Sequence, residues 1–291
     1  MTLVELPDGR VLEVVTAGPE DGIPFVVHHG TPGAARPYPP MVEAAARRGL
    51  RTICYSRPGY GASTAQPGRT VASAAADTAA VLDALGAGEF LTMGGSGGGP
   101  HALCCAALLP DRCRGAASIA GVAPYGAAGL DWLAGMGAEN IEEFDATLGG
   151  PDTLTAYLAA QLPQLAEVTG AELVPALGDL LSPVDSAVLT GEYADFMAGS
   201  FRHATSTGTA GWRDDDLAFV RDWGFPLEAV RRATVWQGGQ DRMVPYAHGE
   251  WLAKHVPGAR ARLLQAEGHL SLLLAKVDEV LDDLLSYPAI P

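Results

Sequence analysis

The stretch Phe90-Leu91-Thr92-Met93-Gly94-Gly95-Ser96-Gly97-Gly98-Gly99-Pro100 decides the fold. A short apolar strand, Phe90–Met93, runs into a glycine-rich turn around Ser96, and a helical pattern follows the proline. The turn is so sharp that residues two before and two after the serine nearly touch, so Gly94 and Gly98 fit where a Cβ would clash. The serine is thereby held in a strained conformation beside a helix N-terminus, which stabilises negative charge. The stretch predicts that Ser96 is a nucleophile.

A glycine-rich turn can also bind phosphate, which is the alternative interpretation of Gly94–Gly99. The dinucleotide-binding pattern G-x-G-x-x-G follows the first strand of its fold, whereas this turn follows a much later strand. The position of the turn along the chain therefore favours the nucleophile.

Strands and helices alternate on both sides of this turn, which predicts parallel βαβ units and an α/β fold. The turn sequence Pro7-Asp8-Gly9-Arg10 predicts an antiparallel hairpin at the sheet edge. The expected strands are Leu3–Leu6, Val11–Thr16, Pro24–His28, Thr52–Tyr55, Phe90–Met93, Gly115–Ile119, Thr234–Gln237 and Arg260–Leu264. The expected helices around them are Tyr38–Arg48, Thr70–Leu85, Pro100–Leu109, Tyr246–His255 and one final helix, Leu270–Leu285.

From about Pro124 to Phe225 the sequence has helical segments and no convincing strand. Ser182-Pro183 predicts a helix start with a capping serine. We expect a core of residues 1–123 and 226–291, interrupted by a helical cap of residues 124–225. Prolines that we expect to separate the cap helices are Pro151, Pro163, Pro175 and Pro183. The apolar stripes of these helical segments form hydrophobic core, and some of their residues face the carboxyl edge of the sheet, where open α/β sheets bind ligands. The residues of these stripes are Trp132, Leu133, Met136, Phe144, Tyr157, Leu158, Met197 and Phe201.

A serine hydroxyl needs a base, and the base needs a group that orients it. His269 follows the last predicted strand and Asp241 follows the strand Thr234–Gln237, so both lie at the same sheet edge as Ser96. The alternatives are a helix-capping histidine and an ordinary turn aspartate. The chain order Ser, Asp, His is the order expected of a catalytic triad on this kind of α/β sheet, and it differs from the orders in chymotrypsin and subtilisin. The order therefore favours a triad.

A tetrahedral intermediate needs two N–H donors aimed at its oxyanion. Gly97 can supply one, and Thr31, in the loop His29-Gly30-Thr31-Pro32-Gly33, can supply the other. We expect His29 to shape this loop rather than act as a base. Of the remaining histidines, His248 and His255 are expected on a helix near the surface, and His203 lies in the cap.

The chain has 291 residues, with 19 basic and 34 acidic side chains and a formal net charge of −15. This charge repels phosphate backbones and anionic lipids, so no nucleic acid or membrane surface is expected as a partner. The N-terminus does not resemble a signal peptide, and no stretch reaches the ~18 apolar residues of a membrane span. Cys54, Cys104, Cys105 and Cys113 lack zinc-site spacing. We expect the four thiols to be reduced and structural, and the protein to be cytoplasmic. The expected partner is a small-molecule substrate, and the sequence leaves open whether the chain forms a homodimer.

Over nearly its whole length the chain resembles the α/β-hydrolase fold family. The resemblance implies a mostly parallel eight-stranded sheet and a helical cap inserted after the sixth strand. One departure is Ser56, where many relatives place aspartate. The motifs that carry the resemblance are His29–Gly33, Arg57–Ser63, Gly94–Gly98, Gly238–Asp241 and Gly268-His269.

Two comparisons within this family narrow the chemistry. Proline iminopeptidases have similar segments but carry tryptophan where this chain has Gly97. Haloalkane dehalogenases and epoxide hydrolases use aspartate as the nucleophile, where this chain has Ser96.

The predicted function is hydrolysis of an ester, thioester or similar small acyl compound by Ser96, His269 and Asp241. No metal or organic cofactor is implied. The same groups support amide or peptide hydrolysis, or C–C cleavage of a diketone-like substrate. A non-catalytic ligand-binding protein on a hydrolase scaffold is the alternative of another class, and the presence of all three triad candidates favours the enzyme.

Overall fold

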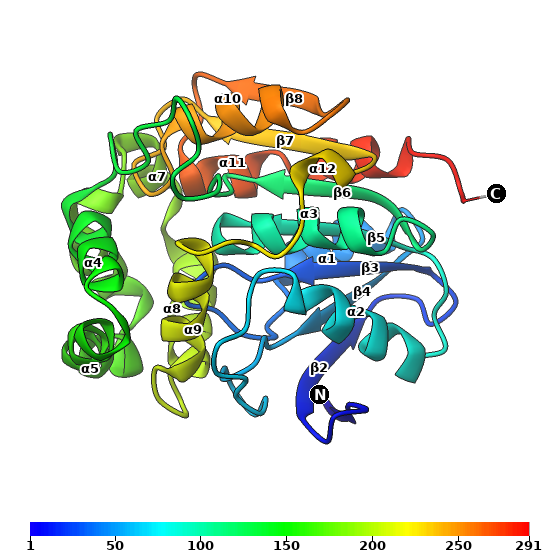
Figure 1. Ribbon diagram of the computed structural model, residues 1–291, viewed down its shortest axis with the longest axis horizontal. Coiled ribbons are helices and arrows are strands. Elements are labelled where there is room, and N and C mark those ends of the chain that lie inside the picture. The colour runs from blue at the N-terminus through cyan, green and yellow to red at the C-terminus, as the bar shows by residue number, and fades with distance from the viewer. Residues whose placement is uncertain (291) are drawn as a thin grey trace.

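A single sheet organises the molecule. In the computed structural model, which describes residues 1–290, the sheet has eight strands in the order β1-β2-β4-β3-β5-β6-β7-β8 (Figure 1). The pairs β1–β2 and β2–β4 are antiparallel and all other neighbours are parallel, which confirms the predicted fold class. The strands are β1 (Thr2–Glu5), β2 (Val11–Ala17), β3 (Ile23–His28), β4 (Leu50–Tyr55), β5 (Phe90–Gly95), β6 (Cys113–Ile119), β7 (Ala233–Gly238) and β8 (Arg260–Leu264).

The antiparallel edge begins with a tight hairpin. The Leu6 N–H donates to the Arg10 carbonyl oxygen at 2.8 Å, and Gly9 has a φ of +82°, a conformation that costs glycine little. Thr2 therefore pairs with Val14, and the predicted hairpin is confirmed.

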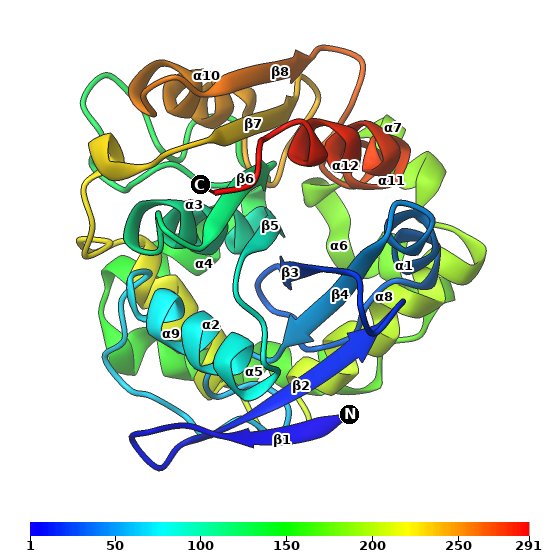
Figure 2. The same cartoon turned by 90° about the vertical axis from the view of Figure 1, so that its right-hand side faces the viewer.

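Helices cover both faces of the sheet because side chains alternate along the strands. Phe25 and Leu91 belong to the core on one face, whereas Val26 and Phe90 belong to the core on the other. Figure 2 shows the two helical layers on opposite sides of the twisted sheet. The layer over Phe25 contains α1 (Pro39–Ala46), α11 (His269–Ala275) and α12 (Val277–Leu285), and the other contains α2 (Ser73–Ala84), α3 (Gly99–Leu108) and α10 (Tyr246–His255).

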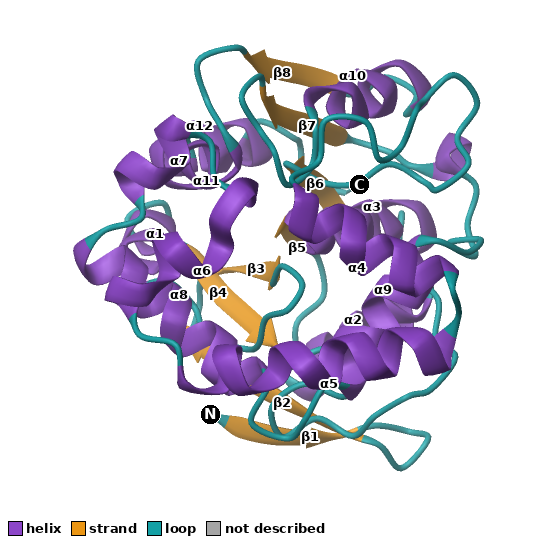
Figure 3. Cartoon of the chain, turned by 90° about the vertical axis from the view of Figure 1, so that its left-hand side faces the viewer, coloured by secondary structure: helices purple, strands orange, loops and turns teal. Residues whose placement is uncertain are grey.

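The segment between β6 and β7 contains helices and no strand, as expected, but its first part, residues 120–137, is loop. Figures 1 and 3 show its helices gathered at one end of the sheet. Ser182 caps α7 by accepting a hydrogen bond from the Asp185 N–H, as its sequence predicts. The helices are α4 (Ala138–Leu148), α5 (Pro151–Glu167), α6 (Leu173–Leu177), α7 (Pro183–Val188), α8 (Gly191–Ala204) and α9 (Ala210–Phe219), and we call this group the cap.

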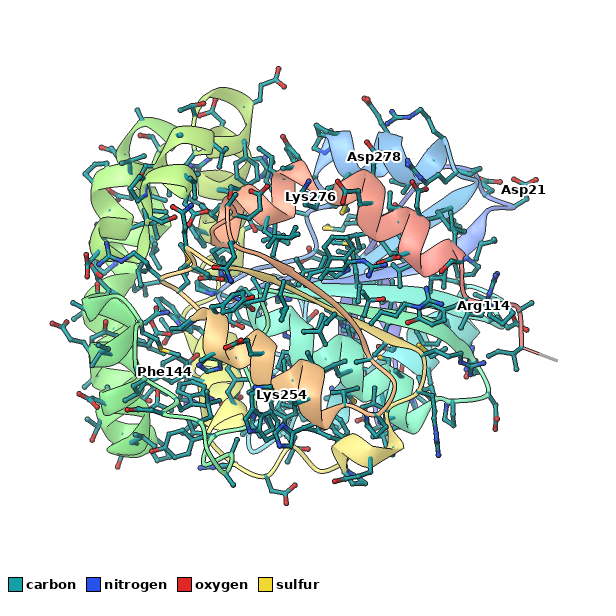
Figure 4. All side chains as sticks on the ribbon, turned by 90° about the horizontal axis from the view of Figure 1, so that it is seen from above. Asp21, Arg114, Phe144, Lys254, Lys276 and Asp278 are labelled. Atoms are coloured by element: carbon teal, nitrogen blue, oxygen red, sulfur yellow. The ribbon has the colours of Figure 1, made fainter. Side chains whose placement is uncertain are left out.

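The predicted single helix Leu270–Leu285 is wrong. The backbone leaves helical geometry at Lys276, with φ −113° and ψ 11°, and this residue separates α11 from α12 (Figure 4). The two helices have different neighbours: α11 packs against α7 and β7, whereas α12 packs against β6 and α1. The break therefore lets each helix bury its own apolar side chains.

Pro163 does not separate two helices but lies inside α5. It is exposed, and the carbonyl group that it deprives of a hydrogen bond belongs to Ala159, which is also exposed. Water can therefore satisfy that carbonyl. Within residues 1–290, no helix combines the length and apolar character that crossing a bilayer requires.

Candidate active site

Ser96 directly follows β5 and has a backbone conformation that residues other than glycine rarely adopt. Its φ is +53°. A Cβ added to Gly94 would lie 2.0 Å from the Gly98 carbonyl oxygen, and one added to Gly98 would lie 2.3 Å from the His28 carbonyl oxygen. Only glycine fits at both positions, so the glycines permit the turn that presents the serine.

His269 and Asp241 meet across two loops of the core. His269 begins α11, and Asp241 follows β7. The His269 Nδ1 atom lies 2.8 Å from Asp241 Oδ2, and both residues are buried. Burial opposes protonation of the imidazole, but the charge and hydrogen bond of Asp241 outweigh it, so the pKa of His269 is raised above its usual value.

Asp241 is itself held in place by three further donors. The Met243 and Val244 N–H groups donate to its Oδ1 at 2.9 and 2.8 Å, and the Gln237 side-chain amide donates to its Oδ2 at 2.9 Å. These bonds fix the carboxylate, and the carboxylate fixes the tautomer that leaves Nε2 of His269 free to accept a proton.

Asp185 of the cap also positions His269, and sequence reasoning did not identify it. Its fully buried carboxylate accepts hydrogen bonds from the N–H groups of His269, Leu270 and Ser271 at 3.0, 2.7 and 2.9 Å. These are the first N–H groups of α11, which have no partner within their own helix. A cap residue therefore anchors the start of the helix that carries the histidine.

The two predicted oxyanion donors lie next to each other. A Cβ added to Gly97 would lie 2.3 Å from Thr31 Oγ1, and one added to Gly30 would lie 3.5 Å from Ser96 Cβ. Within residues 1–290 the Thr31 N–H has no recorded acceptor, and the Gly97 N–H lies in the first turn of a helix. Both residues therefore lie beside Ser96, which is the placement that the predicted oxyanion role requires.

A buried ion cluster supports the Thr31 loop. Asp215 of α9 accepts hydrogen bonds from Thr31 Oγ1 at 2.8 Å and from Tyr60 at 2.9 Å, and it pairs with Arg57 and Arg69 at 2.6 Å each. Burial alone would raise the pKa of Asp215, but the two arginines hold it well below its usual value. Arg57 belongs to the motif Arg57–Ser63 that the sequence analysis identified. No local sequence pattern, in contrast, marks Asp215 of the cap as its partner.

His29 shapes its loop in the way the sequence suggests. Its Nε2 accepts the Arg57 N–H at 3.0 Å, so its Nδ1 donates to the Gly30 carbonyl oxygen at 2.7 Å. Burial and the Arg57 charge lower its pKa, which keeps the ring neutral. His248 is not near the surface: it is fully buried and links the Ala123 N–H to the Trp132 carbonyl oxygen. These two bonds connect His248 of α10 to the loop that follows β6, and they account for the burial of this histidine.

Ser96 and His269 line one pocket of about 360 Å³ between the core and the cap. This volume falls in the range of small-molecule sites. Of the apolar cap residues considered above, Tyr157, Met197 and Phe201 line the pocket, whereas Trp132 and Leu158 belong to the hydrophobic core. Within residues 1–290, no group of three or more histidine, cysteine or acidic side chains is arranged to hold a metal ion.

Residues 23–276 match the model of the alpha/beta hydrolase fold family. The chain is 33% identical over 151 residues to a non-heme chloroperoxidase of Streptomyces lividans, covering 51% of this chain and 54% of that protein. It is 30% identical over 148 residues to epoxide hydrolase B of Mycobacterium tuberculosis (strain H37Rv), covering 49% and 41%. The chain thus spans about half the length of these curated relatives or less.

A solved bromoperoxidase from Bacillus anthracis has the same fold. It superposes with a TM-score of 0.70 at 20% identity, covering 98% of this chain and 99% of that one. The family match extends over most of the sheet, the cap and the Ser96 turn. The chain belongs to the α/β-hydrolase fold family.

Proposed function

We propose that the protein hydrolyses an ester, thioester or related small acyl substrate through an acyl-enzyme on Ser96. The observation that carries this proposal is the placement of Ser96, at φ +53° on its turn, in one pocket with the His269–Asp241 pair. This arrangement supplies a nucleophile, a base and a group that orients the base.

The reaction follows from the protonation states. Neutral His269 accepts the Ser96 proton as the hydroxyl oxygen attacks the acyl carbonyl carbon. The Thr31 and Gly97 N–H groups stabilise the oxyanion, and Asp241 stabilises the imidazolium. The imidazolium then donates its proton to the leaving oxygen or sulfur, and water activated by His269 releases the acid.

Several features favour serine-dependent acyl hydrolysis over the other reactions known for this fold. Epoxide hydrolases of the fold attack with a carboxylate, which the hydroxyl of Ser96 does not supply. The two curated relatives differ in the reactions that their names describe, so they do not select a substrate for this chain. The tryptophan of proline iminopeptidases has no room here, because a Cβ at Gly97 would already lie 2.3 Å from Thr31 Oγ1 and 3.0 Å from Phe219.

A substrate panel tests the proposal. Purified protein is assayed with p-nitrophenyl esters of graded acyl length, with thioesters, and with aminoacyl anilides. We expect turnover of esters or thioesters that Ser96→Ala abolishes. Turnover confined to anilides would favour the amidase alternative, and no turnover of any acyl compound would favour a non-catalytic ligand-binding protein.

A further inference from the structure

One arginine lines the pocket that contains Ser96. Among residues 1–290, Arg36 is the only lysine or arginine in the lining of this space. It follows the Thr31 loop, in the segment between β3 and α1. Within the same residues no carboxylate oxygen lies within 4.0 Å of its guanidinium group, and this group forms no hydrogen bond. The pocket thus has a positive charge that no acidic side chain of the described residues neutralises.

A glycine of the cap makes room for this guanidinium group. Gly199 lies inside α8, where glycine destabilises a helix relative to alanine. A Cβ added to Gly199 would lie 2.6 Å from Cζ and Nη1 of Arg36 and 2.8 Å from Nη2. The same Cζ lies 5.9 Å from the centre of the Phe196 ring. Since Phe196, Met197 and Ser200 line the pocket, the guanidinium group lies against the pocket wall that α8 forms.

Hydroxyl groups without partners accompany the arginine. Tyr38 packs against Phe196 with 4.8 Å between the ring centres, and Tyr193 packs against Tyr38 at 5.3 Å. Tyr38, Tyr193 and Ser200 line the pocket, and within residues 1–290 their hydroxyl groups form no hydrogen bond and are not fully enclosed. A guanidinium group beside free hydroxyl donors is a set of groups that binds an anion.

The acidic residues of the pocket come from another helix. Glu139, Glu142 and Glu143 all belong to α4. Figure 3 shows α4 and α8 on opposite sides of the cap. Glu139 accepts the Asp179 N–H at 3.0 Å and Glu143 accepts the Trp212 indole N–H at 2.8 Å, so two of the three acids already have donors within the cap. The pocket is therefore positive toward α8 and negative toward α4.

We propose that Arg36 binds a carboxylate group of the substrate. This inference rests on the proposed acyl hydrolysis, and the preferred substrates are then esters or thioesters that carry a free carboxylate away from the carbonyl carbon that Ser96 attacks. A carboxylate fits the planar guanidinium group, which can donate two parallel hydrogen bonds to it. One guanidinium group balances the single charge of a carboxylate, whereas a phosphate group carries about 1.5 to 2 charges at pH 7.

The overall charge of the protein does not prevent this contact. The formal net charge is −15, which disfavours the approach of anions in general. At physiological ionic strength, however, salt screens exposed charges beyond about 8 Å. The nearest charge therefore dominates for a bound carboxylate, and at the α8 wall this charge is Arg36.

Matched pairs of substrates test the inference. Monoethyl esters of succinic, glutaric and adipic acid are compared with the ethyl esters of the corresponding monoamides, in which an uncharged carboxamide of similar shape replaces the carboxylate. A second series places the same two groups on the alcohol part, as acetate esters of 3-hydroxypropanoate and 4-hydroxybutanoate and of their amides. The ratio of kcat/KM between acid and amide is measured for wild type, Arg36→Gln and Arg36→Lys. Arg221→Gln is the matched control, because Arg221 is exposed, has no carboxylate within 4.0 Å among residues 1–290 and does not line the pocket.

The wild type is expected to favour the acid about tenfold or more in at least one pair. Arg36→Gln should bring that ratio near one with little change in turnover of the amide. Arg36→Lys should keep part of the preference, because it retains the charge but loses the planar fork, and Arg221→Gln should keep all of it. If Arg36 only joins α8 to the core, Arg36→Gln lowers both rates equally and leaves the ratio unchanged, which overturns the proposal. Equal turnover of acids and amides by the wild type also refutes the carboxylate site, while the proposed acyl hydrolysis stands.

A second variant leaves the arginine in the chain and displaces its guanidinium group. Gly199→Ala adds a Cβ where Arg36 Cζ would be 2.6 Å away, and the long arginine side chain can move aside. Because alanine favours a helix over glycine, the melting temperature should be unchanged or higher. The acid-to-amide ratio should nevertheless fall severalfold. A ratio equal to that of the wild type would contradict the position assigned to the guanidinium group.

A binding measurement is independent of turnover. Ser96→Ala protein, with and without Arg36→Gln, is titrated calorimetrically with the three monoethyl esters and their amide counterparts. Tighter binding of at least one acid than of its amide, which Arg36→Gln removes, supports the site even if no ester is hydrolysed. Equal binding within every pair overturns it.

Discussion

Replacing Asp185 with alanine should both destabilise the protein and misplace His269, the proposed catalytic base. The substitution removes the acceptor of the His269, Leu270 and Ser271 N–H groups, which lie 3.0, 2.7 and 2.9 Å from the carboxylate. An unsatisfied buried donor costs about 1–3 kcal/mol, so three of them would cost roughly 3–9 kcal/mol. A water that enters the vacated space can satisfy some of them, so we expect about 3 kcal/mol.

The same variant should lose turnover. His269 is the first residue of α11, so a shift of that helix start moves the imidazole. A displacement of about 1 Å can cost on the order of 10²-fold in rate. We therefore expect kcat to fall about 10- to 100-fold with a smaller change in KM.

Urea unfolding and steady-state kinetics with a turned-over ester measure the two effects. Asp152→Ala is the matched control: this exposed aspartate lies in the first turn of α5 and should contribute no more than about 1 kcal/mol. An Asp185→Ala protein as stable and as active as the control would refute the role assigned to this carboxylate.

Three further predictions concern pH, acyl length and the serine turn. Because the pKa of His269 is raised, its imidazolium persists to higher pH than that of a free histidine, so kcat/KM should fall toward acid with an apparent pKa above 6.5, and Asp241→Asn should move this limb to lower pH. Each added methylene of a neutral acyl chain should raise kcat/KM about fourfold, from about 0.8 kcal/mol of burial, until the pocket is full; equal rates from acetyl to octanoyl esters would contradict a closed apolar pocket. Gly94→Ala places a Cβ 2.0 Å from the Gly98 carbonyl oxygen and should abolish activity or folding, whereas Gly88→Ala, which meets nothing within 4 Å, should leave melting temperature and kinetics unchanged.

The elements with strong local signals could be predicted from the sequence. The helix at Tyr246–His255 and the strand at Arg260–Leu264 have the expected bounds, because apolar spacing and turn residues mark both ends. Ser96, Asp241 and His269 each follow a predicted strand, and parallel strands bring such positions to one edge of the sheet.

The remaining features depend on contacts between distant segments. Asp185 lies 84 residues before His269, and Thr31 lies 184 residues before Asp215, so no local pattern joins either pair. The break at Lys276 has no proline or glycine to announce it, since it follows from the different neighbours of α11 and α12.

Covalent labelling tests the identity of the nucleophile most directly. A fluorophosphonate probe is added to wild type, Ser96→Ala and His269→Ala, and the modified peptide is identified by mass spectrometry. The account predicts one adduct on Ser96 in the wild type, no adduct in Ser96→Ala, and far slower labelling of His269→Ala, which lacks the base. Labelling of Ser96→Ala at the wild-type rate, or an adduct on another residue of the wild type, would contradict it.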